Sequence, residues 1–167
     1  MNAERKSAQA LSAVLSAVLR ERKLTLAAAE SCTGGLFSKC MTDLSGASEI
    51  YHGGVVSYVN GVKENVLGVS AETLDRFGAV SAETAAEMAA GVRRVCGSDL
   101  GISFTGVAGP SKDDRGNEVG TVYVGIATSE KTYVNLLRLA GDRDTIRRLA
   151  VERGMDMLCD ILQEKGE

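Results

Sequence analysis

Histidine is nearly missing from this chain, which has a single one, His52, among 167 residues. A histidine-rich metal site is therefore excluded, and a catalytic triad that relies on histidine would have to use His52. If the protein is a hydrolase, we expect its general base to be a lysine, a carboxylate or a tyrosine.

The chain also lacks long apolar runs and an excess of positive charge. No apolar run reaches the roughly 20 residues that a membrane-spanning helix needs, and the charged, then amphipathic N-terminus does not resemble a signal peptide. The net charge is -3, whereas a protein that binds the nucleic-acid backbone needs a dense surface of lysine and arginine. We therefore expect a cytoplasmic protein that binds neither membranes nor nucleic acids, although a local basic pocket for one phosphate fits this charge.

The cysteines form no CxxC pair and no spacing typical of a zinc site. Three of them lie in apolar segments, where a free cysteine behaves as a small hydrophobic residue. We predict structural thiols and no metal site.

The succession of apolar segments predicts an α/β fold. Amphipathic periodicity indicates a first helix around 8–19, and Ser70, Ser81 and Asp142 each stand where a helix N-cap is expected. Short apolar or β-branched runs predict strands at 24–28, 51–59, 100–104, 119–128 and 131–139, the last two antiparallel. The order favours one three-layer domain over residues 1–167, a mixed β-sheet with helices on both faces.

Polar residues gather at the ends of predicted strands, where open α/β sheets place their ligands. The first group is the run 29–35 (AESCTGG), in which Ser31 and Thr33 lead through Gly34 into a helix. Such a turn leaves backbone N–H groups free to bind a phosphate or an oxyanion. Alternatively, Ser31 and Thr33 only cap the helix that follows.

The second group combines Tyr58, Asn60 and Lys63. If Asn60 is the N-cap of a short helix, Lys63 is its third residue, where the helix dipole opposes a positive charge and lowers the pKa of the lysine. Partial burial would lower this pKa further. Tyr58 could then hydrogen-bond to the lysine or relay a proton. The alternative is a solvated surface lysine.

The third group is the run 105–110 (TGVAGP). Its glycines would let the backbone approach a ligand closely, although a plain turn explains the same pattern. Further along, Arg143 near the start of the last helix could pair bidentately with a phosphate, or it is an ordinary surface arginine.

Taken together, these groups resemble one protein family. The runs 29–35 (AESCTGG), 45–48 (SGAS), 58–63 (YVNGVK), 105–110 (TGVAGP) and 141–143 (GDR) are similar in order and spacing to the motifs of the CinA C-terminal domain family. The resemblance extends from the first predicted helix to the last. In two-domain members a nucleotide-processing domain precedes this one, and we expect that domain and its activity to be absent here.

The resemblance implies a nicotinamide-nucleotide amidohydrolase, an enzyme of pyridine-nucleotide recycling that converts nicotinamide mononucleotide to nicotinic acid mononucleotide and ammonia. It implies a serine–lysine mechanism without a metal or an organic cofactor. In this mechanism a serine attacks the carboxamide carbon, neutral Lys63 takes its proton, and water cleaves the acyl-serine ester. Lys63→Ala is expected to abolish turnover without loss of folding, because a lysine at that helix position contributes little stability.

Two serines of these motifs, Ser31 and Ser48, are candidate nucleophiles. A straight strand of about seven residues, roughly 23 Å long, would keep Ser48 away from Lys63. A bend at Gly53-Gly54, or a lysine that folds back along the sheet, would remove this objection. The resemblance implies roles for both serines, so both remain candidates.

The resemblance also implies residues that bind the substrate. Arg143 is the candidate for the phosphate, and Thr105 and Gly106 are candidates for the ribose or the carboxamide. The other candidates come from the same motifs: Thr33, Gly34, Gly46, Asn60 and Gly109.

Relatives in this family tend to form dimers, and we expect a homodimer. The competing interpretation is a catalytically inactive paralogue that acts as a protein-binding module related to competence and DNA damage. The polar side chains that the activity would need are all present, which favours the enzyme. A different small-amide hydrolase with the same machinery is a third interpretation.

Overall fold

A five-stranded mixed sheet forms the centre of the molecule, and the computed structural model describes residues 7–164. The strand order is β2-β1-β3-β4-β5, in which β1, β2 and β3 are parallel and β4 and β5 are antiparallel to their neighbours. The strands are β1 (Leu26–Glu30), β2 (Tyr51–Val56), β3 (Leu100–Gly106), β4 (Thr121–Ala127) and β5 (Thr132–Arg138). The predicted α/β class and mixed sheet are confirmed.

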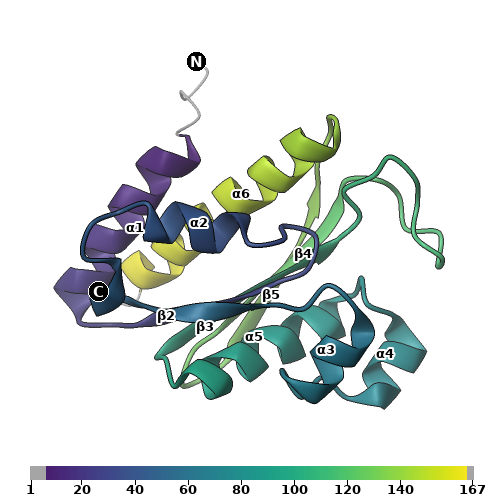
Figure 1. The fold of residues 1–167 in the computed structure, drawn as a ribbon, viewed down its shortest axis with the longest axis horizontal. Helices are drawn as coiled ribbons and strands as arrows, with labels where there is room; N and C mark the ends of the chain where they lie inside the picture. The colour runs from purple at the N-terminus through teal and green to yellow at the C-terminus, as the bar shows by residue number, and fades with distance from the viewer. Residues whose placement is uncertain (1–6, 165–167) are drawn as a thin grey trace.

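Helices cover both faces of this sheet (Figure 1). One face carries α1 (Ala8–Arg22), α2 (Leu36–Thr42) and α6 (Arg143–Glu164). The other carries α5 (Ala82–Cys96), with α3 (Asn60–Asn65) and α4 (Ala71–Phe77) beside it. A short 3₁₀ helix, Ala47–Glu49, precedes β2. Within residues 7–164, no helix is both long and apolar enough to cross a membrane.

Side-chain caps start three of these helices where the sequence predicts them. Ser70 Oγ and Ser81 Oγ each accept a hydrogen bond from the backbone N–H three residues further on, at 3.0 and 3.1 Å. Asp142 Oδ1 accepts from the corresponding N–H at 2.8 Å and so caps α6. These side chains satisfy N–H groups that the first turn of a helix leaves unpaired.

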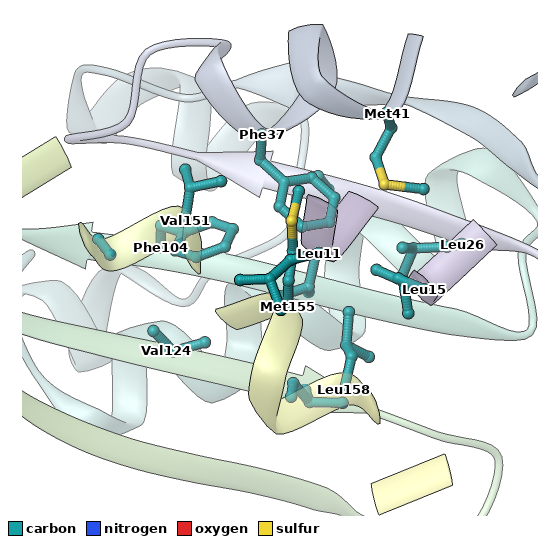
Figure 2. Packing of buried hydrophobic residues seen from close by; sticks show 14 of the residues in the cluster. Leu11, Leu15, Leu26, Phe37, Met41, Phe104, Val124, Val151, Met155 and Leu158 are labelled. Atoms are coloured by element: carbon teal, nitrogen blue, oxygen red, sulfur yellow. The ribbon is translucent and has the colours of Figure 1, made fainter. Parts of the chain in front are cut away.

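The hydrophobic core lies on both sides of the sheet, in keeping with its two helical layers. The larger cluster fills the space between the sheet and α1, α2 and α6, where Phe37 of α2 packs against Phe104 of β3 near Met155 of α6 (Figure 2). The smaller one lies on the α5 side and includes Met88. The central strands β1 and β3 are buried on both faces, which is typical of parallel strands covered by helices.

The topology marks one edge of the sheet as the place for a ligand. From β1 the chain crosses through α2 on one face to β2, and from β2 it crosses through α5 on the other face to β3. The carboxyl ends of β1, β2 and β3 therefore lie at the same edge of the sheet. At this edge the connection after β1 leaves toward one face and the connection after β2 leaves toward the other. Open α/β sheets place their binding sites at such a switch point.

Candidate active site

Ser31 and Lys63 meet at this edge. Ser31 directly follows β1, and its N–H donates to the carbonyl of Phe104 in β3 at 2.9 Å. Lys63 lies in α3, and its Nζ is 3.1 Å from Ser31 Oγ. Two predicted residues from separate motifs are thus in hydrogen-bonding contact.

The amino group of Lys63 is buried and surrounded by backbone oxygens. Only 1% of the residue is exposed. Its Nζ donates to the carbonyl of Ser57 at 2.6 Å and to the carbonyl of Tyr58 at 3.4 Å, and within residues 7–164 it forms no ion pair with a carboxylate. Because burial disfavours the charged form, the pKa of Lys63 falls to about 8. A substantial fraction of the lysine is therefore neutral near physiological pH.

Of the two causes predicted for this low pKa, the structure shows burial. Val59, not Asn60, is the N-cap residue of α3, which makes Asn60 its first residue and Lys63 its fourth. Desolvation of the buried amino group is the largest cause of its lowered pKa. The alternative of a solvated surface lysine is wrong. The expectation that Lys63→Ala leaves folding intact assumed that this lysine contributes little stability. That reason is wrong too, because replacing the buried side chain by alanine would leave a cavity.

A pocket of about 260 Å³ opens beside the Ser31–Lys63 pair. Its walls come from the ends of β1, β2 and β3, the α4–α5 connection, the loop after β3 and the start of α6. Of the residues that the sequence predicts, those that line it are Ser31, Tyr58, Lys63, Thr105, Gly106, Gly109 and Arg143.

Arg143 joins two walls of this pocket. One Nη donates to the carbonyl of Gly109 at 2.6 Å and the other donates to Tyr58 Oη at 3.0 Å. The Tyr58 hydroxyl thus contacts the arginine, and only the Tyr58 backbone contacts Lys63, which differs from the predicted tyrosine–lysine bond. Arg143 is exposed at the surface, and it also lines the cavity with a guanidinium that retains N–H donors for an anion.

Thr105 supports the opposite wall. Its hydroxyl donates to the carbonyl of Ala79 at 2.5 Å and is almost fully buried. Ala79 and Val80 form the α4–α5 connection that closes this side of the cavity. The hydroxyl proton of Thr105 is therefore engaged within the protein, which leaves the oxygen as an acceptor and the following Gly106 backbone for a ligand.

A buried carboxylate holds the turn that follows Ser31. Glu30 is fully buried, and its two oxygens accept from three backbone N–H groups at the start of α2 at 2.9 to 3.1 Å, those of Gly35, Phe37 and Ser38. Gly35, with φ of 99°, occupies the N-cap position. The side chains of Ser31 and Thr33 therefore do not cap this helix, and the capping alternative is wrong.

Arg147 holds the same turn from α6, and the sequence reasoning missed it. Its Nε donates to the carbonyl of Cys32 at 3.1 Å and its Nη2 to that of Thr33 at 2.9 Å. It lies four residues after Arg143, a spacing that puts both side chains on one face of a helix. That spacing was the only feature of the sequence that could have indicated Arg147 as a residue of the site. Nothing in the sequence of the turn indicates that an arginine of α6 contacts it.

The structure does not bring the second candidate serine to this pocket. Ser48 is exposed in the 3₁₀ helix before β2, whereas Lys63 is held by residues that follow β2. The register shifts once between Leu26 and Ala27, yet β2 continues along β1 through Gly53 and Gly54 to its end. No bend folds the strand back, so Ser48 lies at its opposite end, about 20 Å away for a strand of this length.

Four further candidates also lie outside the cavity lining. Gly46 stands beside Ser48 at the far edge, next to the Arg20 guanidinium. Thr33 and Gly34 belong to the turn behind Ser31, and Asn60 opens α3, but none of these three lines the pocket.

A serine beside a buried lysine, at the switch point of a mixed α/β sheet, defines a domain with a candidate hydrolytic site. The chain matches the family model described as the CinA C-terminal domain over residues 8–162. It belongs to this family.

The similar proteins are bacterial. The chain is 52% identical over 151 residues to a protein of Bacillus subtilis (strain 168) that is named as competence-damage inducible, and the match covers 90% of the chain and 36% of that relative. The chain thus spans about a third of the length of this relative.

Solved structures of the same superfamily have the same fold. A CinA superfamily protein from Escherichia coli superimposes with a TM-score of 0.92 at 32% identity, over 96% of this chain and 94% of that one. A competence/damage inducible protein from Agrobacterium tumefaciens gives 0.89 at 31% identity, over 98% and 99%.

Proposed function

We propose that this protein hydrolyses the carboxamide of nicotinamide mononucleotide to nicotinic acid mononucleotide and ammonia, with Ser31 as nucleophile and Lys63 as general base. The observation that carries the proposal is the 3.1 Å contact between Ser31 Oγ and the buried Nζ of Lys63. A serine needs an adjacent base to become nucleophilic, and a desolvated lysine supplies one near neutral pH.

The contacts of Lys63 suit this role. A neutral amine has two N–H donors and one lone pair. The two neighbouring carbonyls, of Ser57 and Tyr58, can accept hydrogen bonds but cannot donate them. When both N–H groups point at these carbonyls, the lone pair is left for the third neighbour, the Ser31 hydroxyl. The surroundings of Nζ therefore orient the neutral lysine to accept the serine proton.

The reaction can be written with these two side chains alone. Ser31 Oγ forms a bond to the carboxamide carbon while its proton moves to Nζ, and the carbonyl oxygen becomes an oxyanion. The protonated lysine then gives this proton to the amide nitrogen, the C–N bond breaks and ammonia leaves. Water attacks the acyl-serine ester, loses a proton to Nζ, and the carboxylic acid product departs as Ser31 regains its proton.

Arg143 is the residue that would recognise the nucleotide part of the substrate. Its guanidinium faces the same cavity as Ser31, and such a fork binds phosphate through two parallel hydrogen bonds. The contacts with the Gly109 carbonyl and the Tyr58 hydroxyl keep it extended over the mouth. A phosphate there would leave the nicotinamide end free to approach Ser31.

Ammonia release from nicotinamide mononucleotide tests the proposal, with free nicotinamide and glutamine as control substrates. We expect release from the mononucleotide and much slower release from either control. No release from the mononucleotide by folded protein would contradict the proposed function.

Arg143→Gln tests the phosphate contact separately. We expect its KM for the mononucleotide to rise about 10- to 100-fold, since a hydrogen bond to a charged group contributes roughly 1.5–3 kcal/mol. Turnover of free nicotinamide, which carries no phosphate, should not change. Equal losses on both substrates would show that Arg143 acts on the fold of the pocket instead.

A further inference from the structure

The turn between Ser31 and α2 is held from two sides by opposite charges. The Glu30 carboxylate accepts from N–H groups at the start of α2, and the Arg147 guanidinium donates to the successive carbonyls of Cys32 and Thr33. A guanidinium that binds two consecutive carbonyls fixes the orientation of both peptide planes.

Two backbone N–H groups in this turn are left over. Within residues 7–164, the N–H of Thr33 donates to no acceptor, and the N–H of Cys32 contacts only its own thiol. The next N–H, that of Gly34, donates to the carbonyl of Ser31 at 3.1 Å. Unpaired N–H groups in the interior of a protein are rare and costly. Of the two, Cys32 lines the pocket directly after the proposed nucleophile, so its N–H is the one available to a bound substrate.

The hydrogen bonds that Arg147 donates to the turn determine the direction of the Thr33 N–H. Among residues 7–164 the only cis peptide is Gly109-Pro110, so the Cys32–Thr33 peptide is trans. In a trans peptide the C=O and N–H point in opposite directions. Because the Cys32 carbonyl points at Arg147 on α6, the Thr33 N–H points away from α6. The positive charge on the carbonyl side also polarises this peptide and strengthens its N–H as a donor.

We propose that Arg147 is a positioning residue for the reaction: by holding the turn after Ser31, it places the backbone N–H of Cys32, a residue that lines the pocket, to hold the oxyanion of the tetrahedral intermediate. The proposal rests on the proposed amidohydrolase function. Preorganised N–H donors of this kind stabilise charge that develops only in the transition state, so their orientation affects kcat rather than substrate binding.

The electrostatics of the neighbouring thiol support this geometry. Burial raises the pKa of the Cys32 thiol to about 12 and the Glu30 carboxylate also raises it, whereas the charges of Arg147 and Lys63 act in the opposite direction. The thiol is therefore protonated and no competitor of Ser31 as nucleophile. An oxyanion beside it would lie within reach of the same two positive charges.

The test compares two arginines of the same helix. Arg147→Gln removes the guanidinium that donates to the two carbonyls of the turn. Arg153→Gln makes the same chemical change at an exposed position of α6. We expect Arg147→Gln to lower kcat for the mononucleotide about 10²- to 10³-fold, the size of effect seen when one oxyanion donor is lost, with KM changed less than threefold. Arg147→Lys should recover part of the loss, and Arg153→Gln should match the wild type. A folded Arg147→Gln with kcat within threefold of the wild type would overturn the proposal.

A second measurement uses the wild-type protein and does not depend on folding of a variant. Nicotinic acid mononucleotide, the product, carries a carboxylate where the oxyanion would form. In a titration of ¹⁵N-labelled protein we expect the Cys32 amide signal to shift together with that of Gly106. If only Gly106 shifts, the turn does not contact the carboxylate and the proposal is wrong. A wild type that neither binds this product nor releases ammonia contradicts the proposed function itself.

Discussion

Two serine motifs of similar composition lie at opposite ends of the β1–β2 pair and have different surroundings. Ser31 follows β1, is partly buried, and contacts Lys63 inside a pocket. Ser48 precedes β2 and is exposed in a one-turn 3₁₀ helix. Since the strands are parallel, the end of one and the start of the other fall on opposite edges of the sheet. The comparison teaches that strand direction, not the presence of serine and glycine, decides which of the two motifs lies beside Lys63 and the pocket.

The acidic neighbours of the two serines differ in the same way. Glu30, next to Ser31, is fully buried and accepts four hydrogen bonds, three from backbone N–H groups and one from the Ser38 hydroxyl at 2.6 Å. Glu49, next to Ser48, keeps 70% of its side chain exposed and pairs with Arg20 at 3.4 Å. The Ser31 end is thus a rigid, buried polar network, and the Ser48 end is an ordinary surface.

The largest expected effect comes from replacing the two serines in turn. Ser31→Ala should lower kcat for the mononucleotide by about 10³-fold or more, since it removes the nucleophile. Ser48→Ala should stay within a few-fold of the wild type. Steady-state ammonia release measures both. The reverse result, with Ser48→Ala inactive and Ser31→Ala active, would refute Ser31 as the nucleophile.

The pH dependence of kcat tests Lys63 at the Ser31 end. The base acts in its neutral form, so the rate should rise with pH around a pKa of about 8 and level off above it. From pH 7 to pH 9 this corresponds to an increase of about tenfold, because the neutral fraction grows from about one eleventh to about ten elevenths. A rate that is flat across this range would argue against Lys63 as the base.

The same shift has a consequence for stability. The folded pKa of Lys63 is lowered from 10.5 to about 8, so between these values the unfolded chain binds more protons than the folded one. The free energy of unfolding should therefore gain a contribution that grows as pH rises through this window. Lys63→Met, which fills the same buried space without a charge, should abolish turnover and remove this contribution. Urea unfolding at pH 7.5 and pH 10 measures the difference for both proteins.

A smaller effect is expected from the two glutamates. Glu30→Gln replaces one acceptor oxygen by an NH₂ group that faces backbone N–H donors, and we expect a loss of about 1–3 kcal/mol in the free energy of unfolding. Glu49→Gln, at the exposed end, should change it by no more than about 0.5 kcal/mol. Denaturant titrations of both variants measure this. If the two losses were equal, the turn after Ser31 would not depend on its buried carboxylate.

Local patterns were sufficient for much of the fold. The mixed sheet, the N-caps at Ser70 and Ser81 and the end of α5 before Gly97 follow from apolar periodicity and capping chemistry, which involve only near neighbours in the chain. Strand ends were predicted less well: the run 51–59 ends as a strand at Val56. Beyond that residue the backbone turns to give its carbonyls to Lys63, a contact that no local pattern reveals.

The sequence by itself determined the α/β class, the polar motifs at strand ends and the family to which the chain belongs, because these depend on residue types and their spacing. Only the tertiary structure placed Ser31, and not Ser48, beside Lys63, since that placement depends on which strand ends share an edge. It also showed that Lys63 is almost completely buried, and this burial lowers its pKa. Finally, it showed that Arg147 reaches a turn more than a hundred residues away in the chain. Desolvation and long-range contacts are properties of the packed molecule, and they exist only once the chain has folded.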